Sequence, residues 1–280
     1  MKRPEQDHKT RVSGRVAGII MRNRIVFIVL GLAVIIFPIV YYIVDTVQRN
    51  LFNEAAGRAY EVEHKYADFK RESDPEKKDA LRKELDEMIQ ETIDRWAGYY
   101  AGSRARLIRT ALNRETLMGA ATPAADGEEA APPAAEVNKA ELATAVVADY
   151  TAIAIETPYS VSAPQALLQA AVFVQNIPSL FEDHAAGDPP APDKVAEVIP
   201  ESLKSDAGFE LASYQDIALV LYRKLVELHP DSVHVPEALI NIGAIEEAKQ
   251  RYQEAALVYD RMEREFSNND WTKVAINRKL

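Results

Sequence analysis

The sequence predicts an all-α protein in which one N-terminal transmembrane helix is followed by a helical hairpin and a solenoid of helical repeats. Three observations lead to this prediction. Residues 25–44 contain no charged side chain. Beyond them, apolar residues recur every three or four positions, as on one face of a helix, and strand-like runs are scarce. The second half also matches itself after a shift of 72 residues, and periods of this size are typical of helical solenoids.

The chain begins with a basic segment and continues as an acidic one. Residues 1–24 carry seven Lys and Arg side chains against two acidic ones, whereas the whole chain has a net charge of -10. The acidic remainder would repel a phosphate backbone, which excludes nucleic acid as a natural partner. The absence of cysteine excludes disulfides, thiolate metal sites, thiol nucleophiles and a lipid anchor on an N-terminal Cys.

Residues 25–44 form the predicted membrane span. Their twenty residues match the roughly 20 that a helix needs to cross the bilayer, and Pro38 is expected to kink it. The basic residues 1–24 before the span and Asp45 after it place the N-terminus in the cytoplasm and the rest outside it. A cleavable signal peptide is the alternative, but its apolar region spans only about 7–15 residues and a small-residue cleavage site follows it. We therefore expect a single-pass protein of the inner membrane with a periplasmic C-terminal domain.

Residues 45–101 are predicted to form a helical hairpin. Apolar residues over 45–71 recur at helical spacing, so the helix should continue straight out of the membrane. It should stop near Ser73, because Asp74 is a good N-cap and Pro75 a good first residue for the next helix. The sequence leaves open whether this hairpin packs on the following domain or stands as a stalk. The second helix places its apolar residues on one face: Leu81, Leu85, Met88, Ile89, Ile93 and Trp96.

The remaining residues, 102–280, form the predicted repeat domain. Two stretches within it are rich in proline, alanine and acidic residues, namely 119–136 and 184–210. Such stretches bury too little apolar surface to order themselves, so both are expected to be flexible loops, the second with a short helix inside it.

An internal repeat supports the solenoid. A further shift of 37 residues takes Tyr222 to Tyr259 and extends the repeat to the C-terminus. Three helix pairs are expected, the first two with expanded loops, and a partial capping helix after Asn269. The 72-residue shift superposes Tyr150, Pro158, Ser160, Val161, Pro164, Ala166 and Leu167 on Tyr222, Pro230, Ser232, Val233, Pro236, Ala238 and Leu239.

The unit that starts at Pro236 resembles the tetratricopeptide repeat family. It departs from that family at Glu246, Met262 and Ser267, and its period is about three residues longer than the usual 34. The matching positions are Leu239, Ile242 and Gly243 in the first helix and Ala255 and Tyr259 in the second.

The resemblance implies a packing scheme. Small residues at Gly243, Ala171 and Ala111 should let paired helices approach closely, while Tyr222 and Tyr259 should fill the seam between neighbouring pairs.

The layout as a whole is also similar to single-pass, membrane-anchored envelope proteins of the YfgM kind. The turn at 229–232 resembles turns in BamD-like and YbgF-like envelope proteins. These resemblances imply a scaffold near the protein-export or outer-membrane assembly machinery.

No motif for catalysis, cofactor binding or metal binding was found in the sequence. The histidines are scattered, and His229 and His234, five residues apart across a turn, lack further ligands. Phosphate loops, nucleophile elbows and dinucleotide fingerprints are absent. We therefore expect no enzyme activity, no cofactor and no metal; an enzyme with an unrecognised site is the third alternative for the function.

Four aromatic residues are candidates for partner binding, because aromatic side chains dominate interface energetics. Trp96, Tyr99 and Tyr100 either bind a partner or pack against the next helix. Trp271 lies in the terminal segment, where little chain remains to cover it.

The sequence as a whole favours a membrane-anchored scaffold. Its expected partners are the bilayer, through residues 25–44, and a peptide or helix of another envelope protein held in the repeat groove. The alternative is a structural subunit of a larger envelope complex, such as a secretion or motility apparatus, which would form homo-oligomers.

Overall fold

The computed structural model describes residues 24–119, 138–182, 188–204 and 211–279. Within these residues every regular element is a helix, which confirms the predicted all-α class. The chain divides into two compact units, Met1–Glu54 and Ala55–Leu280, which are described separately.

The first unit holds the apolar helix. Helix α2 spans Arg24–Arg71 without interruption and contains Pro38. It is the one helix among the described residues that is long and apolar enough to cross a membrane, and its apolar window is not buried by other parts of the protein. The predicted transmembrane segment is therefore helical, and the helix continues to Arg71 as expected.

The second unit begins within α2 and contains all later helices. The segment expected to be a flexible loop at 119–136 lies almost wholly outside the described residues. The bounds are α3 Pro75–Trp96, α4 Tyr100–Gly119, α5 Lys139–Glu156, α6 Ser162–Leu180, α7 Pro192–Glu197, α8 Glu201–Lys204, α9 Tyr214–Leu228, α10 Val235–Ala248, α11 Tyr252–Glu265 and α12 Asp270–Lys279.

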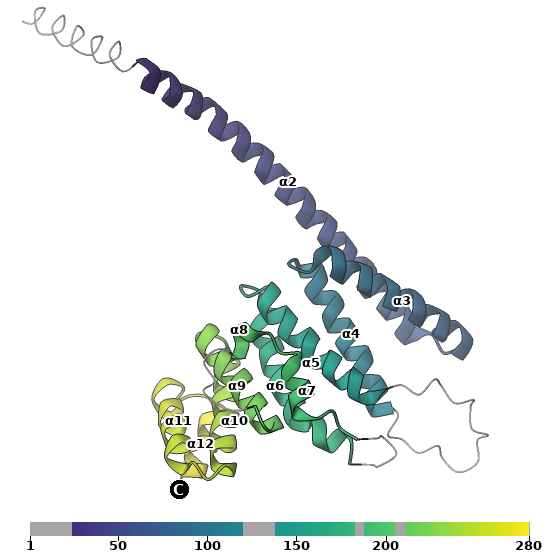
Figure 1. Cartoon of the computed structure of the whole chain (residues 1–280), viewed down its shortest axis with the longest axis vertical. Coiled ribbons are helices and arrows are strands. Elements are labelled where there is room, and N and C mark those ends of the chain that lie inside the picture. The colour runs from purple at the N-terminus through teal and green to yellow at the C-terminus, as the bar shows by residue number, and fades with distance from the viewer. Residues whose placement is uncertain (1–23, 120–137, 183–187, 205–210, 280) are drawn as a thin grey trace, which may run out of the picture. The chain divides into compact units, whose positions relative to one another are not determined.

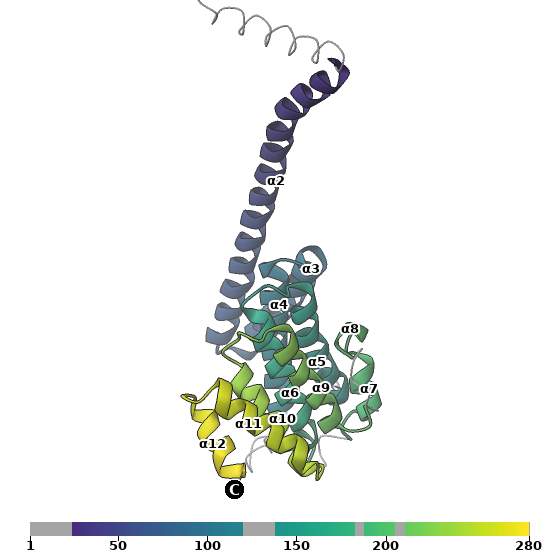
Figure 2. The same ribbon diagram turned by 90° about the vertical axis from the view of Figure 1, so that its left-hand side faces the viewer.

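Consecutive helices of the second unit pack side by side. Contacts join α3 to α4, α4 to α5, α5 to α6, α6 to α9, α9 to α10 and α10 to α11, and α12 packs on both α10 and α11 (Figure 1, Figure 2). Most contacts among the described helices therefore join neighbours in this order, with a few others, such as those of α7 with α5 and α9. The terminal helix α12 begins at Asp270, so the helix expected after Asn269 is present.

The hairpin packs on the helix that follows it, a point that the sequence left open. Val62 and Phe69 of α2, Leu85 and Ile89 of α3 and Leu112 of α4 belong to one buried cluster. The Asp74 side chain accepts hydrogen bonds from the backbone N–H groups of residues 76 and 77, which confirms it as the N-cap of α3. Residues 55–96 thus belong to the same compact unit as the later helices.

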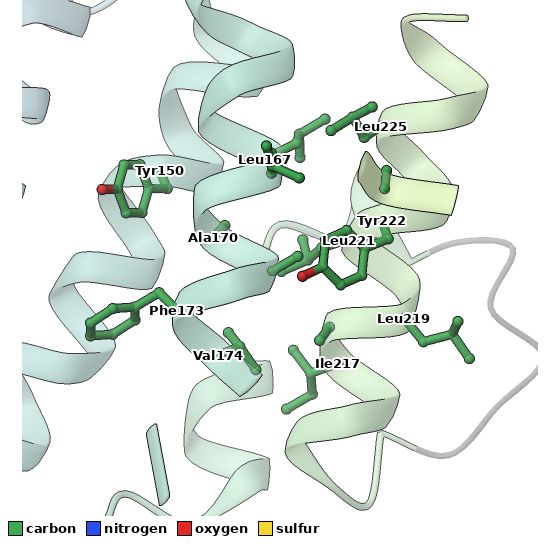
Figure 3. Close-up of a cluster of buried hydrophobic side chains, with 14 of the residues drawn as sticks. Tyr150, Leu167, Ala170, Phe173, Val174, Ile217, Leu219, Leu221, Tyr222 and Leu225 are labelled. Atoms are coloured by element: carbon green, nitrogen blue, oxygen red, sulfur yellow. The ribbon is translucent and has the colours of Figure 1, made fainter. Parts of the chain in front are cut away.

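A second, larger core runs from α4 to α12. In Figure 3, Phe173 points from α6 toward α5, whereas Leu167 and Val174 point toward α9. Helix α6 is therefore apolar on two sides, as expected for a helix between two neighbours. The buried Tyr222 hydroxyl donates a hydrogen bond of 2.6 Å to the Gln175 side chain, so this core tyrosine is fully satisfied.

The expected flexible stretch 184–210 contains two helices, α7 and α8, in its described part. Val195, Ile199 and Leu203 follow one another at intervals of four, and all three are buried against the large core. Pro192 stands at the first position of α7, where proline favours a helix. The short helix expected inside this stretch is therefore present, as α7 followed by α8, and its apolar stripe packs on the large core.

The predicted small-residue positions give a mixed result. A Cβ atom built on Gly243 would lie 2.6 Å from Cζ of Tyr259 and closer still to Cε1, so the close approach of α10 and α11 is confirmed. Ala171 is buried, but Ala111 is exposed. The prediction for Ala111 is wrong because α4 meets α5 through Arg106 and Arg109, which lie on another face of the helix.

Candidate functional site

The turn between α5 and α6 has a defined backbone geometry. Thr157 ends α5 with φ -131° and ψ 57°, and its N–H donates to the carbonyl oxygen of Ile153. The Ser160 N–H then donates to the Thr157 carbonyl oxygen at 2.9 Å, and the Ala163 N–H to the Ser160 carbonyl oxygen at 3.2 Å. The Ser103 and Thr157 hydroxyl oxygens lie 3.0 Å apart, which ties the turn to α4.

The turn between α9 and α10 repeats this geometry 72 residues later. His229 ends α9 with φ -133° and ψ 56°, and its N–H donates to the Leu225 carbonyl oxygen. The Ser232 N–H donates to His229 at 3.0 Å and the Val235 N–H to Ser232 at 3.1 Å. The internal sequence repeat is therefore a repeat of structure.

The turn between α11 and α12 has the same pattern after a further shift of 37 residues. The Phe266 N–H donates to Met262, the Asn269 N–H to Phe266 and the Thr272 N–H to Asn269. The first interval, of 72 residues, is longer than the second because α7 and α8 are inserted between the first and second turns. Between the second and third turns only α10 and α11 occur.

The first two turns lie together and line one groove of about 650 Å³. Tyr159 is fully exposed in it, and Val161 and Val233 expose 92% and 85% of their surface. Scattered apolar residues on a surface need no explanation, but a contiguous exposed patch in a hollow marks a binding site. The groove is lined by Pro158, Tyr159, Ser160, Val161, Pro164, Leu228, His229, Pro230, Asp231, Ser232, Val233 and His234.

The groove has little charge of its own. Asp231 contributes a carboxylate. Burial lowers the pKa of His229, so its imidazole is neutral at pH 7. The Nε2 atom of His229 is buried and has no hydrogen-bond partner among the described residues, which leaves one polar atom beneath an apolar surface. Such a groove suits an apolar segment better than an ionic ligand.

A second hollow of about 410 Å³ lies among α9, α10 and α11. Leu239 and Ile242 of α10 line it together with Leu257 of α11. Glu246, which also lines it, is completely buried and accepts hydrogen bonds from Arg223 at 2.7 Å and from Arg251. The departure from the repeat consensus at Glu246 is thus accommodated by two arginines.

The aromatic residues predicted to bind partners occupy different environments. Trp96 is only 4% exposed and makes an edge-to-face contact with Tyr99, with 5.4 Å between ring centroids. Tyr99 and Tyr100 remain partly exposed at the junction of α3 and α4. Trp96 therefore packs inside the protein and leaves a partner little surface.

Trp271 lies elsewhere, on α12, and is 42% exposed. Its backbone N–H donates to the Asn269 side chain at 2.9 Å, as the His234 N–H donates to the Ser232 hydroxyl in the second turn. Trp271 and His234 are thus equivalent positions of successive turns, 37 residues apart.

The groove residues were missed as a site by sequence reasoning, although one signal was present. Proline and serine recur in the two turns because they fix the turn geometry. The repetition of Val161 and Val233 has no such reason, since both side chains are exposed. Among the described residues, no group of three or more His, Asp or Glu side chains could hold a metal ion. Comparison of the chain with protein-family models, with curated proteins and with solved structures finds no match.

Proposed function

We propose that this protein is a membrane-anchored scaffold that binds a segment of another envelope protein in the groove between its two repeated turns. The observation that carries the proposal is the duplicated turn: the same backbone geometry recurs 72 residues apart and presents an exposed valine both times. A repeated apolar subsite suits a partner segment with apolar residues at regular intervals. No catalysis is proposed.

The proposal includes a tetratricopeptide-like arrangement of the helix pairs. Three findings support it: the internal sequence repeat, the recurrence of turn geometry after 37 residues, and the contact of Gly243 with Tyr259 at the family's small and aromatic positions. In such an arrangement, each pair buries its apolar side only against its neighbours, which leaves the turns free to vary.

The anchor supplies the second part of the proposal. The apolar segment of α2 holds the protein in the inner membrane, with residues 1–24 in the cytoplasm and the helical domain in the periplasm. Confinement to the membrane raises the effective concentration of membrane-bound partners. Burial of one valine or tyrosine side chain stabilises a complex by about 1.5–3 kcal/mol before the cost of association, so three such residues suffice for a weak, reversible contact.

Site-specific photo-crosslinking in intact cells tests the proposal. A photoreactive phenylalanine analogue at Val161 or Val233 of the full chain is expected to capture the same partner protein from both positions. At Tyr60, which is exposed on α2, it should not capture that partner. Replacement of Tyr159, Val161 and Val233 by serine should abolish partner binding without a loss of helix content, since all three side chains are exposed.

Two results would refute the proposed groove. One is the capture of unrelated proteins from Val161 and Val233, and the other is partner binding that survives the triple serine variant. Recovery of only this chain itself from both positions would favour the structural-subunit alternative instead.

A further inference from the structure

Helix α11 presents an unusual combination of residues on its outer face. Glu254, Leu257, Val258 and Arg261 follow one another at helical spacing and line the hollow among α9, α10 and α11. Leu257 exposes 68% of its surface beside that hollow. Leu257 therefore extends the apolar lining of the hollow out to the surface of the protein.

The pattern of these four residues is self-complementary. Reversing the direction of the helix exchanges Glu254 with Arg261 and Leu257 with Val258. If two copies of α11 run antiparallel about a point between Leu257 and Val258, each leucine faces a valine of the other copy. Glu254 of each copy then faces Arg261 of the other. In a two-fold interface the same patch of both copies makes the contact. Here the symmetry produces each charge pair and each apolar pair twice.

We propose that this α11 face binds a second copy of the same chain, with Leu257 of each copy near the hollow of the other. The occupant follows from charge complementarity. A parallel arrangement of two α11 helices would place Glu254 beside Glu254 and Arg261 beside Arg261, which repel. Arg261 Nε already donates a hydrogen bond of 2.8 Å to the Glu265 carboxylate, but this pair is solvent-exposed and such pairs contribute little.

Self-association through α11 goes beyond the proposed function. Only the argument from confinement to one membrane rests on that function. The α11 face shares no lining residue with the groove between the turns, so one copy can hold a partner and a second copy together. A small contact is sufficient because two anchored copies meet in the plane of one membrane.

Cysteine crosslinking in membranes is a direct test, because the chain has no cysteine of its own. The Leu257→Cys variant of the full chain, treated with a short bismaleimide, is expected to form a covalent dimer. The matched control is Tyr252→Cys, on the opposite side of the same helix and 66% exposed. Equal dimer yields from both variants, no dimer from Leu257→Cys, or capture of a different protein there would each overturn the proposal.

Charge reversal provides the sharper test. In the Leu257→Cys background, Glu254→Arg and Arg261→Glu should each weaken the dimer more than roughly tenfold, because each variant places like charges opposite one another twice. When the two variants are produced together with different tags, the mixed dimer should recover, since its facing residues are again opposite in charge. Recovery also excludes misfolding as the cause of the single losses. Failure of the mixed dimer to recover would refute the antiparallel pairing.

The two proposals fail separately. If Leu257→Cys gives no dimer while Val161 still captures a partner protein, self-association is wrong and the groove stands. If the dimer forms and Val161 captures nothing, the opposite holds.

Discussion

The Gly243→Ala substitution tests the close approach of α10 and α11. The added Cβ would lie 2.6 Å from Cζ and 2.8 Å from the hydroxyl oxygen of Tyr259, and closer still to Cε1. Real Cβ contacts are almost never shorter than 3.0 Å. The Tyr259 side chain is almost completely buried, so the ring cannot move aside without disturbing its neighbours.

The expected loss follows from two opposing effects. Overpacking a dense core costs about 1–3 kcal/mol, and the short contact with a buried ring places this site at the upper end. Alanine is favoured over glycine inside a helix by about 1 kcal/mol. The free energy of unfolding should therefore fall by about 2 kcal/mol.

A double-mutant cycle isolates the contact. In a Tyr259→Leu background the ring is absent, so Gly243→Ala should lose its penalty and become stabilising by about 1 kcal/mol through helix propensity alone. Urea unfolding of the full chain in detergent, followed by circular dichroism at 222 nm, measures the free energy of unfolding of the natural protein, the two single variants and the double variant. The control is Gly57→Ala, because nothing lies within 4 Å of a Cβ built there and it should stabilise α2 by about 1 kcal/mol. If Gly243→Ala stabilises the protein as Gly57→Ala does, the inferred approach of α10 and α11 is wrong.

Three other predictions concern single sites. Gly102→Ala should destabilise the protein more than Gly243→Ala does, because the new Cβ would lie 2.7 Å from the carbonyl carbon of Trp96 and backbone cannot swing aside; thermal melting measures this. Asp149→Asn should cost about 3 kcal/mol of unfolding free energy, because the buried carboxylate binds Arg106 at 3.2 Å and Arg109 at 2.5 Å, whereas Asp270→Asn, at a fully exposed pair, should leave the urea midpoint unchanged. Burial lowers the pKa of His229, so its contribution to stability is complete above pH 6.5 and is lost as the pH falls through the lower folded pKa. His229→Thr, which installs the residue of the equivalent first turn, should remove that part of the pH dependence in unfolding measured from pH 7.5 to 5.

The sequence predicted those features that local chemistry determines. Asp74 followed by Pro75 marks the start of a helix because a side-chain acceptor and a proline suit its first turn, and α3 begins there. The resemblance to the repeat family predicted a close approach of helices at Gly243, and the structure places the Tyr259 ring there. The internal repeat was found by shifting the sequence against itself, and its extension to the C-terminus predicted a helix where α12 lies.

Features that depend on distant contacts were not predicted. Arg106 and Asp149 lie 43 residues apart, and nothing near either position indicates that they meet across α4 and α5. A short helix was expected between the prolines of 184–210, but the burial of Val195, Ile199 and Leu203 was not, because a stripe of three residues does not show what it packs against. The sequence did not single out Leu257, because its spacing in α11 does not show which face the neighbouring helices cover.

Comparison of equivalent positions in the repeated units distinguishes residues that folding requires from residues that it does not. Buried positions such as Tyr150 and Tyr222 recur because each helix pair must bury the same kind of apolar side. Turn positions such as Ser160 and Ser232 recur because the hydrogen-bond pattern of the turn requires them. Neither reason applies to Val161 and Val233, which face solvent in a shared groove. The physical demands of folding leave these two residues unexplained, and the proposed contact with a partner accounts for both at once.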